Sequence, residues 1–592
     1  MNKKQELILK QRVMQLAQQK KYSEAKDIAL TIVRALPKDI EVWFALAQLQ
    51  EHEGEFEAAV RSYYQVCQGP SPRYADAIEK SVVLCWRHRL LSLGVSPAQE
   101  LIKLKPTSPD AYFYLGYFWF ESMHYLTAEP YLLKALELAP DNAFLQCYCG
   151  QLYTAIALPE EAIPYYERAQ KLKPNDIETF TSGIMSYNYA DTISEEVVYR
   201  AHRSFGEKLE EKYSSLEGGA DLPAGRPERL KVAYISADFK YHSVAYFFKA
   251  IIESYSSEKF EVICYSDVDK PDEMTECFKG LSDFWVDSCG MTDEELYLQI
   301  RDDGVDIVVD LAGYSGATRL DVFARKAAPV QVSYLGYPNT TGLSRMDFRV
   351  TDNWSDPESV ACLYSESLKY LPGGFLCFTP VNDAPEVSFL PALHRDSERV
   401  CFGSFNAFQK LPVRLLKVWA RVLLAVPNSF LYIKAKPLNE KALCERVVRI
   451  FEDQGVSRDR LELVGWTSDA GSHLGAYSKI DIHLDSYPYN GTTTICEALW
   501  QGVPVITLSG ESHRSRVGLS LLSQLGLESF VASSEQEYID IAVMKASDLA
   551  SLSELRKGMR DRMRSSTLMD RSRFISELET AYEQMWVEKI LN

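Results

Sequence analysis

The sequence predicts an all-helical repeat array over residues 1–213, followed by two α/β lobes over 231–390 and 391–592. Three observations support this order. Prolines and small residues recur at one fixed spacing in the first third of the chain, which is typical of stacked helix pairs. Short β-rich runs alternate with helix-length segments in the remainder, which favours parallel sheets. The 592 residues, 46% of them hydrophobic, are enough for several buried cores.

The repeat period is 34 residues, and four prolines mark it: Pro72, Pro106, Pro140 and Pro174. Small residues follow the same step: Gly116 and Gly150, Ala128 and Ala162, Ala135 and Ala169. This is the tetratricopeptide spacing, in which small residues let two antiparallel helices pack closely and proline ends the second helix. We expect further copies at 6–37 and 40–71, and an irregular segment at 73–105.

Stacked helix pairs form a superhelix whose concave face usually binds extended peptides or other proteins, so we expect protein partners here. The alternatives are a structural spacer and a surface for self-association into a homo-oligomer. Several aromatic residues lie in one first helix, and we interpret them as helix-packing residues rather than a ligand site: Tyr112, Tyr114, Phe118, Trp119 and Phe120.

Residues 214–230 are rich in glycine, proline and charge, which is typical of a linker. The β-rich runs VAYIS, EVICYS, IVVDL and VQVSYLG then predict one parallel sheet, and VCFGSF, SFLYIKA, LELVG, IDIHLD and PVITL predict a second. The proline-containing stretch 373–399 is expected to be a hinge. Two facing lobes of this kind bind ligands in a common cleft at the carboxyl ends of their strands. Residues 571–590 predict an amphipathic helix that packs back across the lobes.

The segment after the apolar strand at 480–484 has the pattern of an anion site. A loop with Gly491 leads into a helix that begins at Thr492, Thr493 and Thr494, and Glu497 follows one turn later. Free backbone N–H groups and the helix dipole favour a phosphate at such a helix start. Glu497 could accept hydrogen bonds from ribose hydroxyls. The alternative is an ordinary capped helix, since Ser and Thr are common N-caps.

Composition argues against several classes of protein. A formal net charge of −18 makes a nucleic-acid backbone an unfavourable partner. We find no apolar core of a signal peptide and no run of membrane-spanning length. The twelve cysteines include no CxxC pair, so we expect free thiols and a cytoplasmic location. No GxGxxG or P-loop motif supports a dinucleotide oxidoreductase or a P-loop kinase.

Six motifs carry a family resemblance: ISADFKYHSVAYF, APVQVSYLGYPNTTGL, FGSFNAFQKLP, VWARVLLAVPNS, LDSYPYNGTTTICEALWQGVPVITLSG and RVGLSLLSQLGL. Through them, residues 230–590 resemble the SPINDLY and O-linked N-acetylglucosamine transferase family, which joins tetratricopeptide repeats to a two-lobed GT-B glycosyltransferase of family 41. FLCFTP, YPNTTGL and NGTTTICEAL resemble the SPINDLY branch more closely. The resemblance implies an inverting, metal-independent transfer of one sugar from a nucleotide-sugar, UDP-N-acetylglucosamine or GDP-fucose, to Ser or Thr hydroxyls of intracellular proteins, with no further cofactor.

The resemblance also implies roles in donor binding. Lys410 matches the family lysine that contacts the donor diphosphate, where a cation offsets the charge that grows on the leaving group. Without the match, Lys410 would be interpreted as a solvated lysine at a helix start. The other implied donor-binding residues are the phosphate-binding threonines, a ribose-binding acid and a histidine near the base: Thr492, Thr493, Thr494, Glu497 and His473.

His242 matches a family histidine in the cleft, for which a general-base role and a role in positioning the acceptor or the sugar are both open, as is a purely structural one. Asp238 could orient His242 or merely cap the next helix. Asn339, Thr340 and Gly342 match the loop beside the donor sugar.

Two residues depart from the animal N-acetylglucosamine enzymes, which carry glutamine where Ala407 stands and a histidine near Asp306. We expect both positions in or near the donor cleft. Plant SPINDLY proteins use GDP-fucose and other members UDP-N-acetylglucosamine, so the donor stays open. Two alternative functions also remain: a non-catalytic repeat scaffold, and a GT-B enzyme for a specialised acceptor such as flagellin or a glycan.

Two acidic patterns could indicate a metal. Asp267 and Asp269 spell a DxD motif, whose carboxylates can bridge a divalent cation to a diphosphate. The pair is distant in sequence from the threonines, and the family it resembles needs no metal, so we interpret it as a surface turn. Asp481, His483 and Asp485 alternate on one strand, which fits a metal site and strand packing equally well. We therefore expect no metal site.

Overall fold

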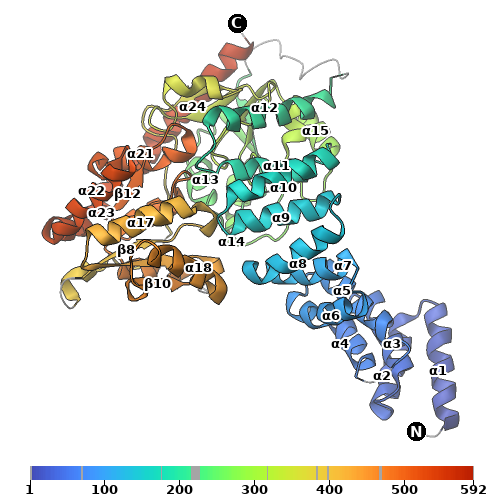
Figure 1. Cartoon of the computed structure of the whole chain (residues 1–592). Helices are drawn as coiled ribbons and strands as arrows, with labels where there is room; N and C mark the ends of the chain where they lie inside the picture. Colours follow the sequence, from blue (N-terminus) through green and yellow to red (C-terminus); the bar gives the residue numbers. More distant parts are fainter. Residues whose placement is uncertain are drawn as a thin grey trace. The chain divides into compact units, whose positions relative to one another are not determined.

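The structure is a computed structural model that describes residues 3–68, 71–174, 176–214, 227–316, 318–381, 384–395, 399–465 and 470–590. The chain forms two compact units, one of residues 1–152 with 439–443, the other of residues 153–438 with 444–592 (Figure 1). Most of the linker expected at 214–230 lies outside the described residues. None of the described helices combines the length and the apolar composition that a bilayer-spanning helix needs.

Helices alone build the first unit, and from α1 to α8 each packs on the next along the chain. They are α1 (Lys3–Gln18), α2 (Tyr22–Ala35), α3 (Ile40–His52), α4 (Phe56–Val66), α5 (Tyr74–Arg87), α6 (Leu91–Leu104), α7 (Pro109–Glu121), α8 (Tyr125–Leu138) and the start of α9 (Ala143–Ala155). The helical pattern continues into the second unit with α10 (Pro159–Leu172), α11 (Ile177–Tyr187) and α12 (Glu195–Glu211). The repeat array predicted from the period is therefore confirmed.

The small residues lie where the helices approach most closely. A Cβ atom added to Gly116 in α7 would lie 2.8 Å from the side chain of Leu132 in α8, and Ala128 and Ala135 are fully buried. The segment 73–105, expected to be irregular, instead forms the regular pair α5 and α6. In this repeat the glycine has moved to the second helix, because Gly94 stands 34 residues before Ala128 and a Cβ there would overlap Phe118.

The first lobe is a seven-stranded parallel sheet in the order β3-β2-β1-β4-β5-β6-β7. Its strands are β1 (Leu230–Ser236), β2 (Phe260–Ser266), β3 (Phe284–Asp287), β4 (Ile307–Asp310), β5 (Val330–Ser333), β6 (Phe348–Thr351) and β7 (Ser367–Tyr370). The central strands β4, β5 and β6 are buried along their whole length, as expected for a sheet covered on both faces. The helices of this lobe are α13 (Ala245–Ile252), α14 (Glu273–Leu281), α15 (Asp293–Asp302) and α16 (Leu320–Ala324).

The second lobe is a six-stranded sheet in the order β10-β9-β8-β11-β12-β13, and all of its pairings are parallel. Its strands are β8 (Val400–Ser404), β9 (Ser429–Lys434), β10 (Leu461–Val464), β11 (Ile482–Leu484), β12 (Val505–Leu508) and β13 (Val531–Ala532). Its helices are α17 (Val413–Ala425), α18 (Lys441–Glu452), α19 (Ala470–Gly475), α20 (Thr493–Trp500), α21 (Val517–Ser523), α22 (Glu535–Ser547) and α23 (Leu549–Arg564). The strand order reverses between β8 and β11, so a ligand is expected at the carboxyl ends of these two strands.

The last helix, α24 (Arg571–Ile590), returns to the first lobe, as predicted. The hydroxyls of Tyr582 and Tyr234 lie 3.2 Å apart, and the backbone N–H of Ser256 donates to Glu579 over 2.6 Å. A second connection lies between the loop after β6 and the loop after β12. There the buried His513 Nδ1 lies 2.7 Å from an oxygen of the buried Asp356. The lobes are thus joined both by the terminal helix and by the buried contact between His513 and Asp356.

Candidate active site

The helix start predicted to bind phosphate lies directly after β11. Thr492 is the N-cap residue of α20, but its side chain makes no capping hydrogen bond. Thr492 and Thr494 are half-buried, whereas Thr493 is nearly buried. The Thr493 hydroxyl lies 3.5 Å from the backbone oxygen of Ser243, which belongs to the other lobe. The first hydroxyl of α20 is therefore not occupied by ordinary capping, and the helix start faces the first lobe.

Lys410 lies beside this helix start. It ends a single 3₁₀ turn (Phe408–Lys410) that follows β8, and its Nζ donates to the backbone oxygen of Asn490 over 3.0 Å. The ammonium also lies 3.7 Å from the centre of the Tyr489 ring, a favourable cation–π distance. Burial lowers the pKa of Lys410 to about 8 because the ammonium loses hydration, while Asp485 acts in the opposite direction. The structure thus brings the predicted cation next to the predicted helix start.

Asp485 shapes the loop between β11 and α20. Its Oδ1 accepts the backbone N–H of Gly491 over 2.8 Å, and its Oδ2 accepts the hydroxyl of Thr507 over 2.8 Å. Burial raises the pKa of Asp485 to about 6, against the effect of these hydrogen bonds. The carboxyl group therefore fixes the backbone immediately before the threonines.

The other members of the alternating strand pattern have structural partners. Asp481 pairs with Arg395 and accepts the backbone N–H of Cys401 over 2.8 Å. His483 Nε2 accepts the backbone N–H of Phe405 over 3.3 Å, and burial lowers its pKa to about 3. Within the described part of the chain, no group of three or more His, Cys, Asp or Glu residues could hold a metal ion.

His473 and Glu497 lie together, as a ribose and base site requires. His473 Nε2 is 3.3 Å from Glu497 Oε2, and His473 Nδ1 is 3.0 Å from Lys434 Nζ. Because an ammonium can only donate, Nδ1 is the acceptor, and the proton of the neutral ring lies on Nε2, toward the carboxylate. The hydroxyl of Tyr477 lies 3.5 Å from the same carboxylate oxygen.

Sequence analysis missed Lys434 and Tyr477. The signal for Lys434 was available, since it ends the buried strand β9 at the edge where α/β folds bind ligands. No local pattern marks Tyr477, which approaches Glu497 only through the packing of its 3₁₀ turn (Ala476–Lys479).

His242 lies in the loop that precedes α13. Its Nδ1 is 3.4 Å from Asp238 Oδ2 and equally far from the backbone nitrogen of Val244. Asp238 does not cap α13, whose N-cap is Val244, so its contact is with the imidazole. Burial raises the pKa of Asp238, and His242 opposes this shift. The imidazole remains 43% exposed, and the adjacent Ser243 contacts the threonine helix.

The loop predicted beside the donor sugar is buried, and its side chains contact the protein itself. Asn339 Nδ2 donates to Asn188 over 3.0 Å, and the Thr340 hydroxyl donates to Glu366 over 2.6 Å. Gly342 adopts φ +76, and a Cβ there would lie 2.1 Å from the backbone oxygen of His202 in α12. Within the described residues, no side-chain hydrogen bond joins this loop to the threonine helix.

The buried loop is nevertheless connected to Lys410 through a few residues. Asn188, which binds Asn339, precedes Tyr189, and the Tyr189 ring stacks on Tyr489 with centroids 5.5 Å apart. Tyr489 is the ring that lies under Lys410. The loop therefore supports the lysine indirectly.

The structure also places the DxD pair, Asp267 and Asp269, and the two residues that differ from the animal enzymes, Asp306 and Ala407. Asp267 is not part of a surface turn, since it is buried and Arg319 donates to both of its oxygens over 2.8 and 2.9 Å, whereas Asp269 is exposed. Asp306 lies at the amino end of β4, bonded to the backbone N–H of Lys231, and so at the edge of the sheet opposite the cleft. Ala407 follows β8, in the turn that carries Lys410.

The chain matches the family model for Glycosyl transferase family 41 over residues 220–382 and 392–578, and a tetratricopeptide repeat model over 150–176. It is similar to the probable UDP-N-acetylglucosamine–peptide N-acetylglucosaminyltransferase SPINDLY of Petunia hybrida, with 39% identity over 424 residues, 70% of this chain and 45% of that protein. The probable UDP-N-acetylglucosamine–peptide N-acetylglucosaminyltransferase SEC of Arabidopsis thaliana is 30% identical over 385 residues, which are 62% of this chain and 38% of that protein. The chain thus spans less than half the length of these curated relatives.

A solved structure has the same architecture. A lysine-to-methionine mutant of Thermobaculum terrenum O-GlcNAc transferase superposes with a TM-score of 0.78 at 32% sequence identity, covering 87% of this chain and 98% of that one. This likeness confirms the predicted fold, a tetratricopeptide array followed by the two lobes of a GT-B glycosyltransferase.

Proposed function

Because the chain belongs to glycosyltransferase family 41, we propose that it transfers a single sugar from a nucleotide-sugar to Ser or Thr hydroxyls of protein acceptors. The donor is UDP-N-acetylglucosamine or GDP-fucose. One observation carries the proposal: Lys410 Nζ donates to the backbone oxygen of Asn490, which lies two residues before Thr492, the N-cap of α20. A cation and a free helix start at one place suit a pyrophosphate.

The chemistry follows from this arrangement. As the bond between the sugar and the diphosphate breaks, negative charge grows on the leaving oxygen. Lys410 and the backbone N–H groups of α20 offset that charge, so the transfer needs no divalent cation. Glu497, held by His473 and Tyr477, accepts hydrogen bonds from the ribose hydroxyls.

The acceptor hydroxyl attacks the anomeric carbon from the side opposite the diphosphate, which inverts the configuration. We assign His242 to the acceptor side of the cleft. When Nδ1 carries the ring proton and directs it at Asp238 Oδ2, 3.4 Å away, Nε2 is the nitrogen that takes the acceptor proton. The contact of Ser243 with Thr493 keeps this histidine close to the donor helix.

The test uses Lys410→Met, which keeps most of the side-chain volume and removes the charge. We expect transfer to be lost and stabilisation by UDP or GDP to weaken, while far-ultraviolet circular dichroism stays that of the parent. Lys417→Met is the matched control, since Lys417 is exposed on α17 and should leave both measurements unchanged.

Parallel incubations with UDP-N-acetylglucosamine and GDP-fucose, followed by intact-mass analysis of protein acceptors, identify the sugar. A scaffold would show no thermal stabilisation by either nucleotide. Transfer to free saccharides but not to peptides would instead support the specialised-acceptor alternative.

A further inference from the structure

The connection between α11 and α12 lies against the surroundings of Lys410. Tyr189, in this connection, is buried, and its ring stacks on the Tyr489 ring with centroids 5.5 Å apart and planes inclined by 22°. The Lys410 ammonium lies over that same Tyr489 ring. The side chain of Gln409, the residue before Lys410, approaches the Tyr189 hydroxyl. Tyr189 therefore contacts both the ring partner and the sequence neighbour of the lysine.

The first turn of α12 reaches the same loop through an ion pair. Glu195 accepts hydrogen bonds from both terminal nitrogens of Arg514, each over 2.8 Å, and Arg514 is only 1% exposed. Such a bidentate pair fixes the orientation of the guanidinium as well as pairing its charge. The backbone oxygen of Arg514 accepts the N–H of Asn490 over 2.8 Å, and the backbone oxygen of Asn490 accepts the Lys410 ammonium. Two residues thus link Glu195 to the lysine.

Asn490 does not move independently of its loop. It is fully buried, its Nδ2 donates to the backbone oxygen of Ser486 over 2.8 Å, and its Oδ1 accepts the N–H of Gly518 over 3.2 Å. These bonds join the loop before α20 to the first turn of α21. The loop is therefore one hydrogen-bonded unit, and the position of Lys410 follows that of the unit. The connection between α11 and α12 contacts it at two places.

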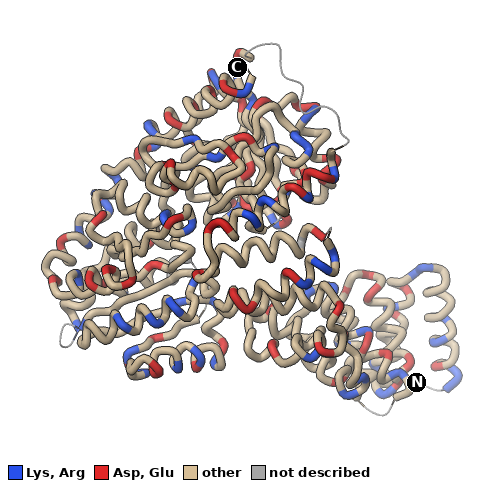
Figure 2. The backbone as a smooth tube through the Cα atoms, turned by 45° about the horizontal axis from the view of Figure 1, so that its top comes forward, with Lys and Arg blue, Asp and Glu red and all other residues tan. Residues whose placement is uncertain are grey.

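The placement of Lys410 matters because the protein as a whole repels anions. The formal net charge is −18, and acidic side chains are interspersed with basic ones along the described chain (Figure 2). Asp485, in the loop before α20, adds a negative charge close to the lysine. An ammonium attracts a diphosphate at short range, and a misplacement of about 1 Å can change a reaction rate about a hundredfold. Binding and transfer therefore depend on where the lysine is held.

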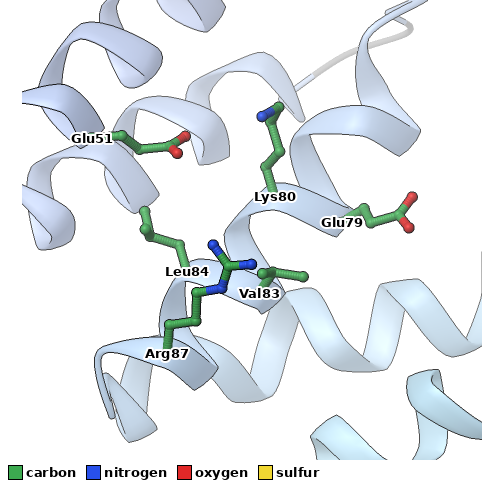
Figure 3. A pocket seen from close by; sticks show the side chains of 6 residues that line it. All are labelled: Glu51, Glu79, Lys80, Val83, Leu84 and Arg87. Carbon is green, nitrogen blue, oxygen red and sulfur yellow. The ribbon is translucent and has the colours of Figure 1, made fainter.

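A cavity in the first unit also contains basic side chains, but it does not suit a diphosphate. Its volume is about 230 Å³, and two acidic, two basic and two apolar residues line it: Glu51, Glu79, Lys80, Arg87, Val83 and Leu84 (Figure 3). The two carboxylates balance the two cations, so the cavity has no excess of positive charge. The contacts around Lys410 are therefore the ones that bear on donor binding.

We propose that Tyr189 and Glu195 are positioning residues that hold Lys410 against the donor diphosphate. Tyr189 acts through the Tyr489 ring, and Glu195 acts through the backbone of the loop before α20. Both act through the lysine and not by contact with the donor. The inference rests on the proposed function, since it takes Lys410 as the diphosphate ligand. It extends that function by giving the last helices before the two lobes a part in donor binding and transfer.

Isothermal titration of the full chain with inorganic pyrophosphate, UDP and GDP tests the inference. Tyr189→Leu and Glu195→Gln should each weaken binding about fivefold or more, because the ammonium is no longer held at the diphosphate. Tyr189→Phe keeps the stacked ring and should bind like the parent. In the Lys410→Met background, Tyr189→Leu and Glu195→Gln should leave the residual binding of UDP or GDP unchanged, because no cation remains to be positioned.

Neighbouring residues provide matched controls. Tyr187→Leu removes a ring of α11 whose hydroxyl donates to Glu167 over 3.2 Å, and Glu196→Gln removes an exposed carboxylate of α12 that lies 3.9 Å from Arg200. Both variants should bind all three ligands like the parent. Thermal unfolding of each variant is measured beside its binding. If Tyr189→Leu does not fold, Glu195→Gln decides the test, since the Glu195 side chain is 20% exposed.

Failure of this inference is distinguishable from failure of the proposed function. Pyrophosphate affinity that falls in Lys410→Met but stays unchanged in Tyr189→Leu or Glu195→Gln would remove the unchanged residue from the assignment. Equal losses of UDP or GDP binding in the parent and Lys410→Met backgrounds would show that these residues act on the fold and not through the lysine, which overturns the inference alone. Unchanged binding in Lys410→Met would overturn the proposed function and this inference with it.

Discussion

The ammonium of Lys410 is desolvated, which is unusual for a lysine, so we expect donor binding to depend on pH. Its lowered pKa of about 8 means that the free protein loses this cation as the pH rises through that value. A bound diphosphate stabilises the ammonium, so binding near about pH 8.5 should take up protons, and binding near about pH 6.5 should not. Donor affinity should fall as the pH rises above 8.

Isothermal titration with UDP and GDP in buffers of different ionisation enthalpy measures this uptake. Lys410→Met should abolish the uptake at the higher pH and leave binding at the lower pH without uptake. Equal proton uptake in the parent and in this variant would show that another group titrates.

Glu497 and Lys410 are assigned to different parts of one ligand, and inorganic pyrophosphate separates them. Glu497→Gln keeps the side-chain shape and removes the charge that pairs with ribose hydroxyls. We expect about tenfold weaker binding of UDP or GDP, with binding of inorganic pyrophosphate unchanged. Lys410→Met should weaken both. If Glu497→Gln impaired pyrophosphate binding equally, the ribose assignment would be wrong.

At the scale of elements, the small residues at the repeat positions allow neighbouring helices to approach closely. Gly94 in α6 has no room for a side chain, because a Cβ would lie 2.3 Å from the Phe118 ring. Gly94→Ala should lower the free energy of unfolding of the first unit by about 1–3 kcal/mol. Urea unfolding followed by circular dichroism measures this change.

Gly558→Ala in α23 is the matched control, since nothing lies within 4 Å of its added Cβ. This exchange should be neutral or stabilising by up to ~1 kcal/mol, because alanine favours a helix interior over glycine. A Gly94→Ala variant as stable as the parent would refute the close contact of α6 with α7.

The elements that form the candidate site are short and were largely predictable. The apolar runs that became β8, β9, β11 and β12 and the threonines that open α20 are local patterns, so the sequence predicts them directly. Lys410 and Asn490, which contact each other, are 80 residues apart in the sequence. Only the family resemblance predicted that this lysine lies at the helix start.

At the scale of the whole molecule, two of the unpredicted features depend on distant partners. Asp267 is buried because Arg319 pairs with it, and the loop at Asn339 packs inward because Asn188 of the helical region meets it. Residue type and local spacing carry no information about such partners. The expectation that Asp306 lies near the cleft failed for a topological reason, since it precedes its strand instead of following it.

The contact between His513 and Asp356, which joins the lobes, gives a prediction at this scale. His513, together with hydrogen bonds, holds the pKa of the buried Asp356 down at about 2 against the desolvation of the carboxylate. An unfolded aspartate titrates near about 3.9. The pair therefore contributes stability above about pH 4, and that contribution is lost as the pH falls toward 2.

Asp356→Asn should lower the free energy of unfolding at neutral pH by ~1–3 kcal/mol, because the buried His513 loses its carboxylate partner. Asp561→Asn, at an exposed pair with Arg564, should cost less than ~1 kcal/mol. Urea unfolding at several pH values measures both. Equal stability of the Asp356→Asn variant and the parent would show that the lobes do not depend on this contact.

In the proposed mechanism, Lys410 and the amino end of α20 hold the pyrophosphate of a nucleotide-sugar. A crystal structure of the full chain soaked with UDP or GDP would locate that pyrophosphate. We expect phosphate oxygens within hydrogen-bond distance of Lys410 Nζ and of the backbone N–H groups that begin at Thr492, with the ribose at Glu497. Density for the diphosphate elsewhere, with Lys410 still bonded only to Asn490, would contradict it.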